Sequence, residues 1–172
     1  QRQTRVAGAD RVGGRWQGAC YPFRRGLKSG ITRVLWGQQG GLWCGLTNRG
    51  WGSLGNSQHG LQRLVWRGET PFELREITAT KEGFKLAFTQ PIFAGSALPM
   101  GFKVKSWTYD HHKAYGCPPR DTRSHDVLSV AVSADATSVE IEVADPELCR
   151  GFEVNGEGVR AAAVTLSLLH GT

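Results

Sequence analysis

The amino-acid sequence lacks several features that would assign a function directly. No apolar run approaches the roughly 20 residues of a membrane-spanning helix, and the most apolar stretch, AAAVTLSLL at 161–169, is much shorter. No cysteine stands in a C-x-x-C or C-x-x-C-H pattern, so the usual redox, zinc and c-type haem motifs are absent. A G-x-S-x-G nucleophile motif is also missing. We therefore expect no transmembrane segment, no cofactor, no metal and no catalytic residues.

The chain has four cysteines, two in each half. In an oxidising compartment this distribution permits the disulfides Cys20–Cys44 and Cys117–Cys149. Isolated thiols, which behave as small buried hydrophobic groups, are the alternative. The sequence leaves both alternatives open.

Charge and tryptophan are unevenly distributed along the 172 residues. Residues 1–75 hold twelve Lys and Arg against three Asp and Glu, a balance of +9, whereas residues 76–172 hold nine against twelve, a balance of −3. Five of the six Trp residues also lie in the first part. A basic, aromatic segment suits an anionic partner such as nucleic acid, lipid headgroups or an acidic protein surface. A solvated surface rich in arginine is the alternative.

The first part of the chain predicts a small antiparallel sheet. Residues 31–37 (ITRVLWG) alternate apolar and polar side chains, 38–41 (QQGG) are typical of a turn, and 42–48 (LWCGLTN) return as a second strand. A third strand is expected over 61–68, followed by Gly and Pro residues that end it. This order of strand, turn, strand, long loop and strand is typical of a β-propeller blade.

The second part predicts further short strands. Two are expected within 74–92 around the turn KEG, another within 101–112, a hairpin over 126–145 and one or two strands within 149–169. Residues 113–125 are expected to form a long loop. Period-2 alternation with turns roughly every 8–12 residues favours a β-sandwich of immunoglobulin type.

We therefore predict an all-β chain in three parts. Residues 1–15 form an extended basic arm, 16–73 a Trp- and Gly-rich, blade-like antiparallel sheet, and 74–172 an immunoglobulin-like β-sandwich. No amphipathic pattern long enough for a stable helix is visible.

Several segments resemble the C-terminal region of secreted glucose/sorbosone-dehydrogenase-like proteins. They are GLWCGLTNRGWGSLG, GLQRLVWRGETPFE, EITATKEGFKLAFTQP and FKVKSWTY, within residues 16–160, and TNRGWGS and GLQRLVW are the most specific. The resemblance implies a last propeller blade followed by a β-sandwich, an extracytoplasmic location, and relatives that are often joined to c-type cytochromes. Most of the propeller and any cytochrome motif are missing, so the family's sugar and quinone chemistry does not carry over.

The sequence GWGSLG at 50–55 is a literal G-x-G-x-x-G. A dinucleotide site needs a strand before this motif, a helix after it and an acidic residue about 20 positions further on. The strand and Glu73 are present, but the residues that follow have a β-like pattern and no helix. Without a helix N-terminus no row of free N–H groups faces a pyrophosphate. Turn glycines with positive φ are the favoured interpretation.

Five residues are predicted to contact a partner. Trp51 and Arg49 could form an exposed platform for stacking and cation–π contacts with a protein or a sugar. The alternative is that Trp51 caps the sheet core and that Arg49 donates hydrogen bonds to carbonyls of the loop. The other three, chosen from the basic aromatic segment, are Trp16, Arg24 and Arg25.

Polar residues in the second part offer weaker candidates. Asp110, His111 and His112, with His125, suggest a metal site, but neighbouring residues on a strand point to opposite faces, so a solvated loop is preferred. Asp121, His125 and Asp126 lie in one expected loop, but no nucleophile stands beside them in the sequence.

An incomplete blade has uncovered edges and faces, which are stable only when something covers them. We therefore expect a non-catalytic, extracytoplasmic accessory or scaffold subunit, peripheral to a membrane, that docks on a larger protein assembly through its N-terminal half. The resemblance implies an assembly that contains cytochromes, carries out electron transfer at a membrane and offers an anionic surface; nucleic acid is not expected. The alternatives are a fragment of a quinone- or haem-linked sugar dehydrogenase and a carbohydrate-binding module.

Overall fold

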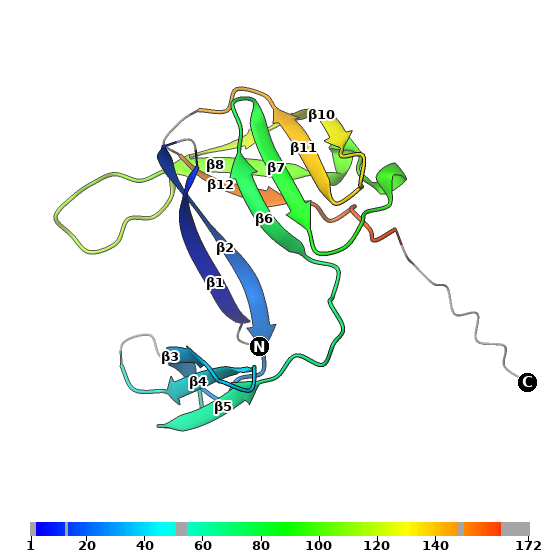
Figure 1. Cartoon of the computed structure of the whole chain (residues 1–172). Helices are drawn as coiled ribbons and strands as arrows, with labels where there is room; N and C mark the ends of the chain where they lie inside the picture. The colour runs from blue at the N-terminus through cyan, green and yellow to red at the C-terminus, as the bar shows by residue number, and fades with distance from the viewer. Residues whose placement is uncertain (1–2, 13, 51–54, 148–149, 163–172) are drawn as a thin grey trace, which may run out of the picture. The chain divides into compact units, whose positions relative to one another are not determined.

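The computed structural model describes residues 3–12, 14–50, 55–147 and 150–162. This part of the chain is all-β, as predicted, and its strands pair antiparallel in four sheets (Figure 1). The helical segments among these residues are two short 3-10 turns, η1 (Ala94–Ser96) and η2 (Pro99–Gly101). The chain divides into two compact units, Gln1–Glu69 and Thr70–Thr172, which we call unit 1 and unit 2.

Unit 1 begins with a long two-stranded hairpin of β1 (Gln3–Val12) and β2 (Arg15–Arg25). The segment expected as an extended arm is therefore paired over most of its length. The register shifts between Thr4 and Arg5, where Arg5 lies opposite Pro22. Because proline has no N–H to donate to the ladder, it is tolerated in strands mainly at such irregularities and at edges.

Unit 1 continues with a three-stranded sheet in the order β3-β4-β5, made of β3 (Gly30–Trp36), β4 (Leu42–Thr47) and β5 (Gly60–Leu64). The β3–β4 turn closes with hydrogen bonds from Gly37 N–H to the Gly41 carbonyl and from Gly40 N–H to the Gly37 carbonyl. Gly40 and Gly41 have φ of 71° and 93°, which favours glycine at both positions. The three strands occur in the predicted order, although β5 ends at Leu64. Their assignment to a propeller blade stays a prediction.

Unit 2 contains two antiparallel sheets. The first has the order β10-β11-β7-β6 and the second the order β12-β8-β9. The strands are β6 (Leu74–Ala79), β7 (Gly83–Phe88), β8 (Lys103–Thr108), β9 (Arg120–His125), β10 (Val127–Val132), β11 (Ser138–Val143) and β12 (Gly151–Asn155).

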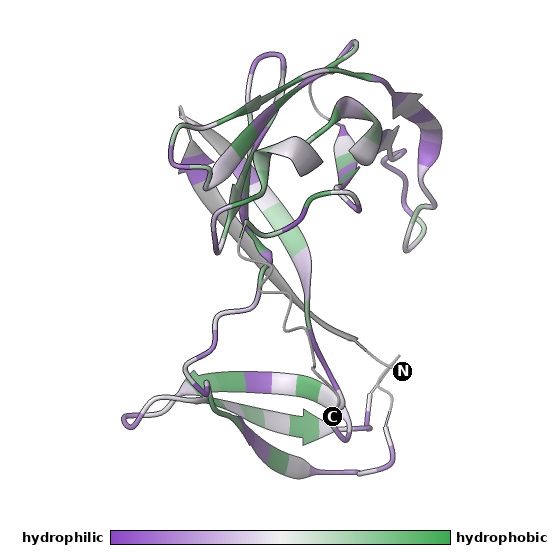
Figure 2. Ribbon diagram, turned by 90° about the vertical axis from the view of Figure 1, so that its right-hand side faces the viewer, coloured by the Kyte–Doolittle hydropathy of each residue, from purple (hydrophilic) through white to green (hydrophobic). Residues whose placement is uncertain are grey.

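One hydrophobic core joins these two sheets. Phe84 of β7 and Phe152 of β12 meet edge to face with ring centroids 5.2 Å apart, an arrangement that aromatic pairs prefer. Most residues predicted to alternate inward on β7, β8 and β11 are buried, and hydrophobic and hydrophilic positions alternate along strands in Figure 2. The prediction is wrong for Leu128, which is 58% exposed, because the register of β10 shifts between Val127 and Ser129. The most buried members of the core are Leu86, Ile92, Val104, Val139, Ile141 and Val143.

The sandwich expected for the second part therefore corresponds to two sheets around a shared core. The more specific assignment of this sandwich to the immunoglobulin type stays a prediction.

The expected loop over 113–125 is wrong at its C-terminal end, because residues 120–125 form strand β9. β9 lies at the edge of its sheet, and five of its six residues are exposed. An exposed edge strand does not need apolar side chains on either face, so it gives no period-2 hydrophobic signal.

We expect Ile141→Ala to lower the free energy of unfolding by about 2–5 kcal/mol, because it removes a buried side chain and leaves a cavity. Ile141 is 1% exposed in the shared core, whereas Leu128 on the neighbouring strand β10 is 58% exposed. Leu128→Ala is therefore the matched control and should change stability little. Chemical denaturation followed by circular dichroism measures both effects, and equal losses would contradict this assignment of the core.

Candidate functional site

The glycine-rich loop of unit 1 is a structural turn. Gly50 and Gly55 have φ of 105° and 139°, values that side-chain-bearing residues rarely adopt. A Cβ atom at Gly55 would lie 2.4 Å from the Lys28 carbonyl oxygen. Strand β5 follows this loop, and no helix does. The prediction of turn glycines is confirmed for Gly50 and Gly55, and residues 51–54 lie outside the described residues.

Side-chain hydrogen bonds hold both ends of this loop. The Ser29 hydroxyl donates to the Ser57 carbonyl at 2.6 Å and accepts from the Ser57 N–H at 3.1 Å. The Asn48 amide donates to the Gly55 carbonyl at 3.3 Å. The exposed Arg49 donates from Nη2 to the Gln58 side-chain Oε1 at 3.1 Å, so its side chain contacts the segment after the loop through a side-chain amide rather than through loop carbonyls.

The other predicted partner-binding residues lie at separate places along the chain. Trp51 is outside the described residues, and Trp16 lies in β2, with its side chain outside the described part. Arg24 and Arg25 end β2, where both are exposed, and the Arg24 guanidinium carbon lies 5.9 Å from the Phe23 ring centroid.

Of the two alternatives for the cysteines of unit 1, the structure has free thiols and not the Cys20–Cys44 disulfide. Cys20 and Cys44 are both free, because Cys20 is exposed on β2 whereas Cys44 is fully buried on the central strand β4. Burial raises the pKa of the Cys44 thiol. Cys117 is also free, and Cys149 lies outside the described residues.

Large apolar side chains are exposed on and after the outer strands of the three-stranded sheet. On β3 they are Val34, Leu35 and Trp36, which are 56%, 71% and 74% exposed. On and after β5 they are Leu61, Val65 and Trp66, which are 67%, 59% and 71% exposed. We call these six residues the exposed apolar surface of unit 1, which includes both faces of the sheet.

The same region carries only positive side-chain charge. Residues 11–68 include no Asp or Glu at all. The cations in that stretch are Arg11, Arg15, Arg24, Arg25, Lys28, Arg33, Arg49, Arg63 and Arg67.

Two of these arginines share a sheet face with apolar residues. The register places Leu35, Trp43 and Arg63 in one row across the three strands, and directly opposed residues share a face. The neighbouring row on the same face consists of Arg33, Gly45 and Leu61. The Arg63 guanidinium carbon lies 5.6 Å from the Trp43 ring centroid. This face is therefore both apolar and basic.

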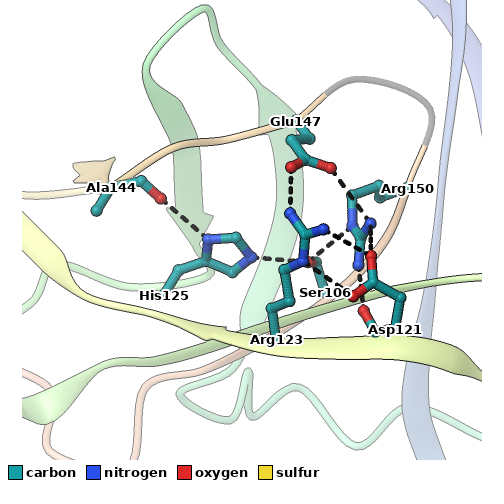
Figure 3. Close-up of polar contacts among 7 residues, drawn as sticks. All are labelled: Ser106, Asp121, Arg123, His125, Ala144, Glu147 and Arg150. Carbon is teal, nitrogen blue, oxygen red and sulfur yellow. Dashed lines mark hydrogen bonds and ion pairs between the residues drawn. The ribbon is translucent and has the colours of Figure 1, made fainter.

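Unit 2 contains a polar cluster that includes Asp121 and His125, which the sequence placed in one expected loop, together with residues that the sequence did not link to them (Figure 3). At its centre, Ser106 Oγ lies 2.7 Å from His125 Nε2, and His125 Nδ1 lies 2.9 Å from the Ala144 carbonyl oxygen. A carbonyl only accepts, so Nδ1 carries a hydrogen, and in that tautomer of the neutral ring Nε2 accepts a hydrogen bond from the Ser106 hydroxyl. The geometry is that of a serine–histidine pair.

Arg150 joins this pair to two carboxylates. Its Nε–H donates to Ser106 Oγ at 3.0 Å, and its Nη1 lies 2.9 Å from Asp121 and 3.2 Å from Glu147. Arg123 completes the cluster, since it bonds to the same two carboxylates. The Arg150 side chain is 6% exposed, so its charge is buried but paired.

The hydroxyl at the centre of the cluster is enclosed by protein. Ser106 is 0% exposed, so a substrate does not reach its hydroxyl without local opening. The cluster instead connects β8, β9 and the segment that follows β11. Asp121 has a φ of 48°, an uncommon conformation for a residue other than glycine, and its backbone carbonyl also accepts from Arg150.

One signal in the sequence pointed to this cluster. Ser106 follows Phe102 and Val104 on the inward side of the period-2 alternation, and all three are buried. A buried hydroxyl needs a hydrogen-bond partner. Which residues supply it depends on pairing between segments that are distant in sequence.

The suspected metal ligands do not form a site in the described residues. Asp110 forms an ion pair with Arg120, and His111 and His112 are exposed. Across the described ranges no three His, Cys, Asp or Glu side chains are grouped so that they could hold a metal ion.

Within the described part of the chain, no helix has the length and apolar character that a membrane crossing needs. Comparison with known proteins finds no matching family model, no matching curated protein and no matching solved structure.

We expect Ser106→Ala to lower the free energy of unfolding by about 1–3 kcal/mol, because it leaves the Arg150 and His125 side chains with an unmade buried hydrogen bond. Ser129→Ala is the control, since the exposed Ser129 hydroxyl donates to Glu142 at 2.8 Å, and its loss should have a smaller effect. Chemical denaturation of the full chain measures both. An unchanged stability would show that the cluster has another role.

Asp121 should make the stability of unit 2 depend on pH. Hydrogen bonds from Arg123 and then Arg150 lower the pKa of Asp121 below its ordinary value of 3.8. A lowered folded-state pKa contributes stability above pH 3.8 that is lost as the pH falls through the folded-state value. Asp121→Asn should therefore destabilise the protein at about pH 6 and progressively less below about pH 3.

Urea unfolding across this pH range tests the effect, with Asp126→Asn as the control for an exposed carboxylate nearby. A difference between wild type and Asp121→Asn that stays constant with pH would contradict it.

Proposed function

We propose that this chain is a non-catalytic accessory or scaffold subunit that docks on a larger protein assembly through unit 1. The observation that carries the proposal is the exposed apolar surface of unit 1, within a stretch that has no carboxylate side chain.

The energetics of this surface support docking. Leaving a Val, Leu or similar side chain exposed forgoes about 1.5–3 kcal/mol relative to full burial. Single exposed apolar residues are normal, but several on one small sheet are characteristic of an interaction surface. A partner that covers Leu35, Trp36 and Trp66, which are each more than 70% exposed, would recover this energy.

The charge of unit 1 favours an acidic protein surface as the partner. Residues 1–69 contain eleven Lys and Arg residues and two carboxylates, Asp10 and Glu69. Opposite charge on the partner would steer association and suppress wrong partners. Arginine and tryptophan are also the residue types that most often dominate binding energy at protein interfaces.

The proposal of a non-catalytic role is supported by the burial of Ser106. Its serine–histidine pair has the distances of an activated nucleophile, but the hydroxyl is enclosed and also accepts a hydrogen bond from Arg150. An accessible nucleophile would be needed for acyl transfer.

The location and the identity of the assembly are narrower proposals. The resemblance to the C-terminal region of glucose/sorbosone-dehydrogenase-like proteins supports an extracytoplasmic, cytochrome-containing electron-transfer assembly at a membrane. This part of the proposal rests on that resemblance alone.

The full chain, tagged and expressed in its native source, should co-migrate with a large complex in size-exclusion chromatography. We expect the double substitution Trp36→Ser and Trp66→Ser to release it, with a loss of co-migrating material of about tenfold or more, because both side chains belong to the exposed apolar surface.

The matched control is Met100→Ser with Leu128→Ser, which removes two exposed apolar side chains from unit 2 and should leave co-migration unchanged. Migration as a free polypeptide that oxidises aldoses with an added quinone would overturn the proposal in favour of a dehydrogenase fragment.

A further inference from the structure

Strand β3 is an unusual edge strand. Among the described residues it pairs with β4 alone, so one row of its backbone N–H and C=O groups has no strand beside it. Its residues from Thr32 to Trp36 are all exposed. Leu35 lies on one face of the sheet, and Val34 and Trp36 lie on the other.

Three edge strands of unit 2 are protected more strongly than β3, whose charged residue is Arg33. β9 carries Arg120, Asp121 and Arg123, β6 carries Arg75 and Glu76, and η2 lies against β10. Charged side chains and covering segments are the usual protection against unwanted strand pairing. A strand with large apolar side chains exposed on both faces resembles an interior strand whose neighbour is missing.

Charge indicates what that neighbour is. β3 carries Arg33, its sheet carries Arg63 on the same face, and residues 11–68 have no carboxylate. Pairing β3 with β3 of a second copy would bring two copies of this basic region together, and like charges on adjacent strands are destabilising. An acidic strand would place opposite charge beside Arg33.

We propose that β3 accepts an extended, acidic segment of the docking partner as an added strand. Main-chain hydrogen bonds supply the affinity in this mode, and alternate side chains supply the specificity. The segment would alternate carboxylate and apolar residues, so that its carboxylates lie on the face of Arg33 and its apolar side chains lie on the opposite face, beside Val34 and Trp36. This inference rests on the proposed docking function and specifies the partner chemistry at one edge.

The structure also limits where the added strand begins. The β3–β4 register shifts between Ile31 and Arg33, and Arg33 Nη1 donates to the Thr32 carbonyl at 2.8 Å. A bulge of this kind ends regular pairing. The added strand would therefore pair with residues 33–36.

The test uses the full chain and three synthetic peptides of about ten residues. The first alternates Glu and Val, the second alternates Lys and Val, and the third repeats the first with alternate backbone nitrogens methylated. Fluorescence anisotropy measures affinity, and amide hydrogen exchange locates the site. The protein variants are Arg33→Glu and, as the matched control on a unit 2 edge strand, Arg75→Glu.

The expected result is that the Glu/Val peptide slows amide exchange in residues 33–36. The Lys/Val and methylated peptides should each bind about tenfold or more weakly, since one lacks the charge and the other the main-chain donors. Arg33→Glu should weaken the Glu/Val peptide by a similar factor, whereas Arg75→Glu should not. The methylated and unmethylated Glu/Val peptides are compared on the wild-type chain, so this comparison does not depend on the folding of any variant.

Two results with the peptides would overturn the inference: amide exchange in β3 that the Glu/Val peptide does not change, or a methylated peptide that binds as tightly as the unmethylated one. A third is amide exchange in β3 that slows as the protein concentration is raised without peptide, which would indicate a second copy as the added strand. The docking function can be separated from it. A chain that co-migrates with its assembly while β3 exchanges at the free rate docks without strand addition. A chain that binds the Glu/Val peptide at β3 but no assembly has the strand-accepting edge without the docking function.

Discussion

Each β-strand must pair its backbone groups and cover at least one apolar face, and the two units meet this constraint differently. Unit 2 meets it from its own residues, because two sheets share a core across which Phe84 and Phe152 touch. In the three-stranded sheet of unit 1, the central strand holds the buried residues Cys44 and Leu46, while the outer strands leave apolar side chains exposed. The features that suggest a function all arise from this difference.

The polar cluster of unit 2 is continuous with the core of that unit. His125 lies 5.9 Å from Phe152, ring to ring, so the hydrogen-bonded histidine packs against the aromatic pair that joins the sheets. A buried guanidinium such as that of Arg150 is costly unless its donors are paired, and here two carboxylates and a hydroxyl pair it. Removing one partner would leave the others unsatisfied, which makes the cluster a constraint on how β9 and the segment after β11 are placed.

The sequence predicted those parts of the fold in which a strand has one buried face. The alternation of Val139, Ile141 and Val143, for example, corresponds to the buried side of β11. Strand β9 could not be predicted in this way, because its exposed polar residues have no preferred face. The pairing of β1 with β2 was missed because their central residues, Ala7 to Ala9 and Gly18 to Cys20, carry small side chains with little hydrophobic contrast.

The candidate sites were predictable only in part. The excess of positive charge and of tryptophan in the first part of the chain is a property of composition, so it was visible without a structure. The cluster around Ser106 depends on sequence separations as large as the 44 positions between Ser106 and Arg150, and each member alone is an ordinary polar residue. Only the pairing of β8 with β9 and β12 brings them together.

The burial of Cys44 makes the rate at which its thiol is modified a measure of how the sheet of unit 1 opens. Its thiol lies on the central strand with no exposed surface, and burial disfavours the thiolate that modifying reagents require. Its rate of modification is therefore governed by how often the small sheet opens, while Cys20, exposed on the hairpin, reports the reactivity of a surface thiol in the same molecule. Any ligand that closes or extends the sheet would slow the modification of Cys44 without affecting that of Cys20. The ratio of the two modification rates would therefore report whether a ligand occupies the sheet.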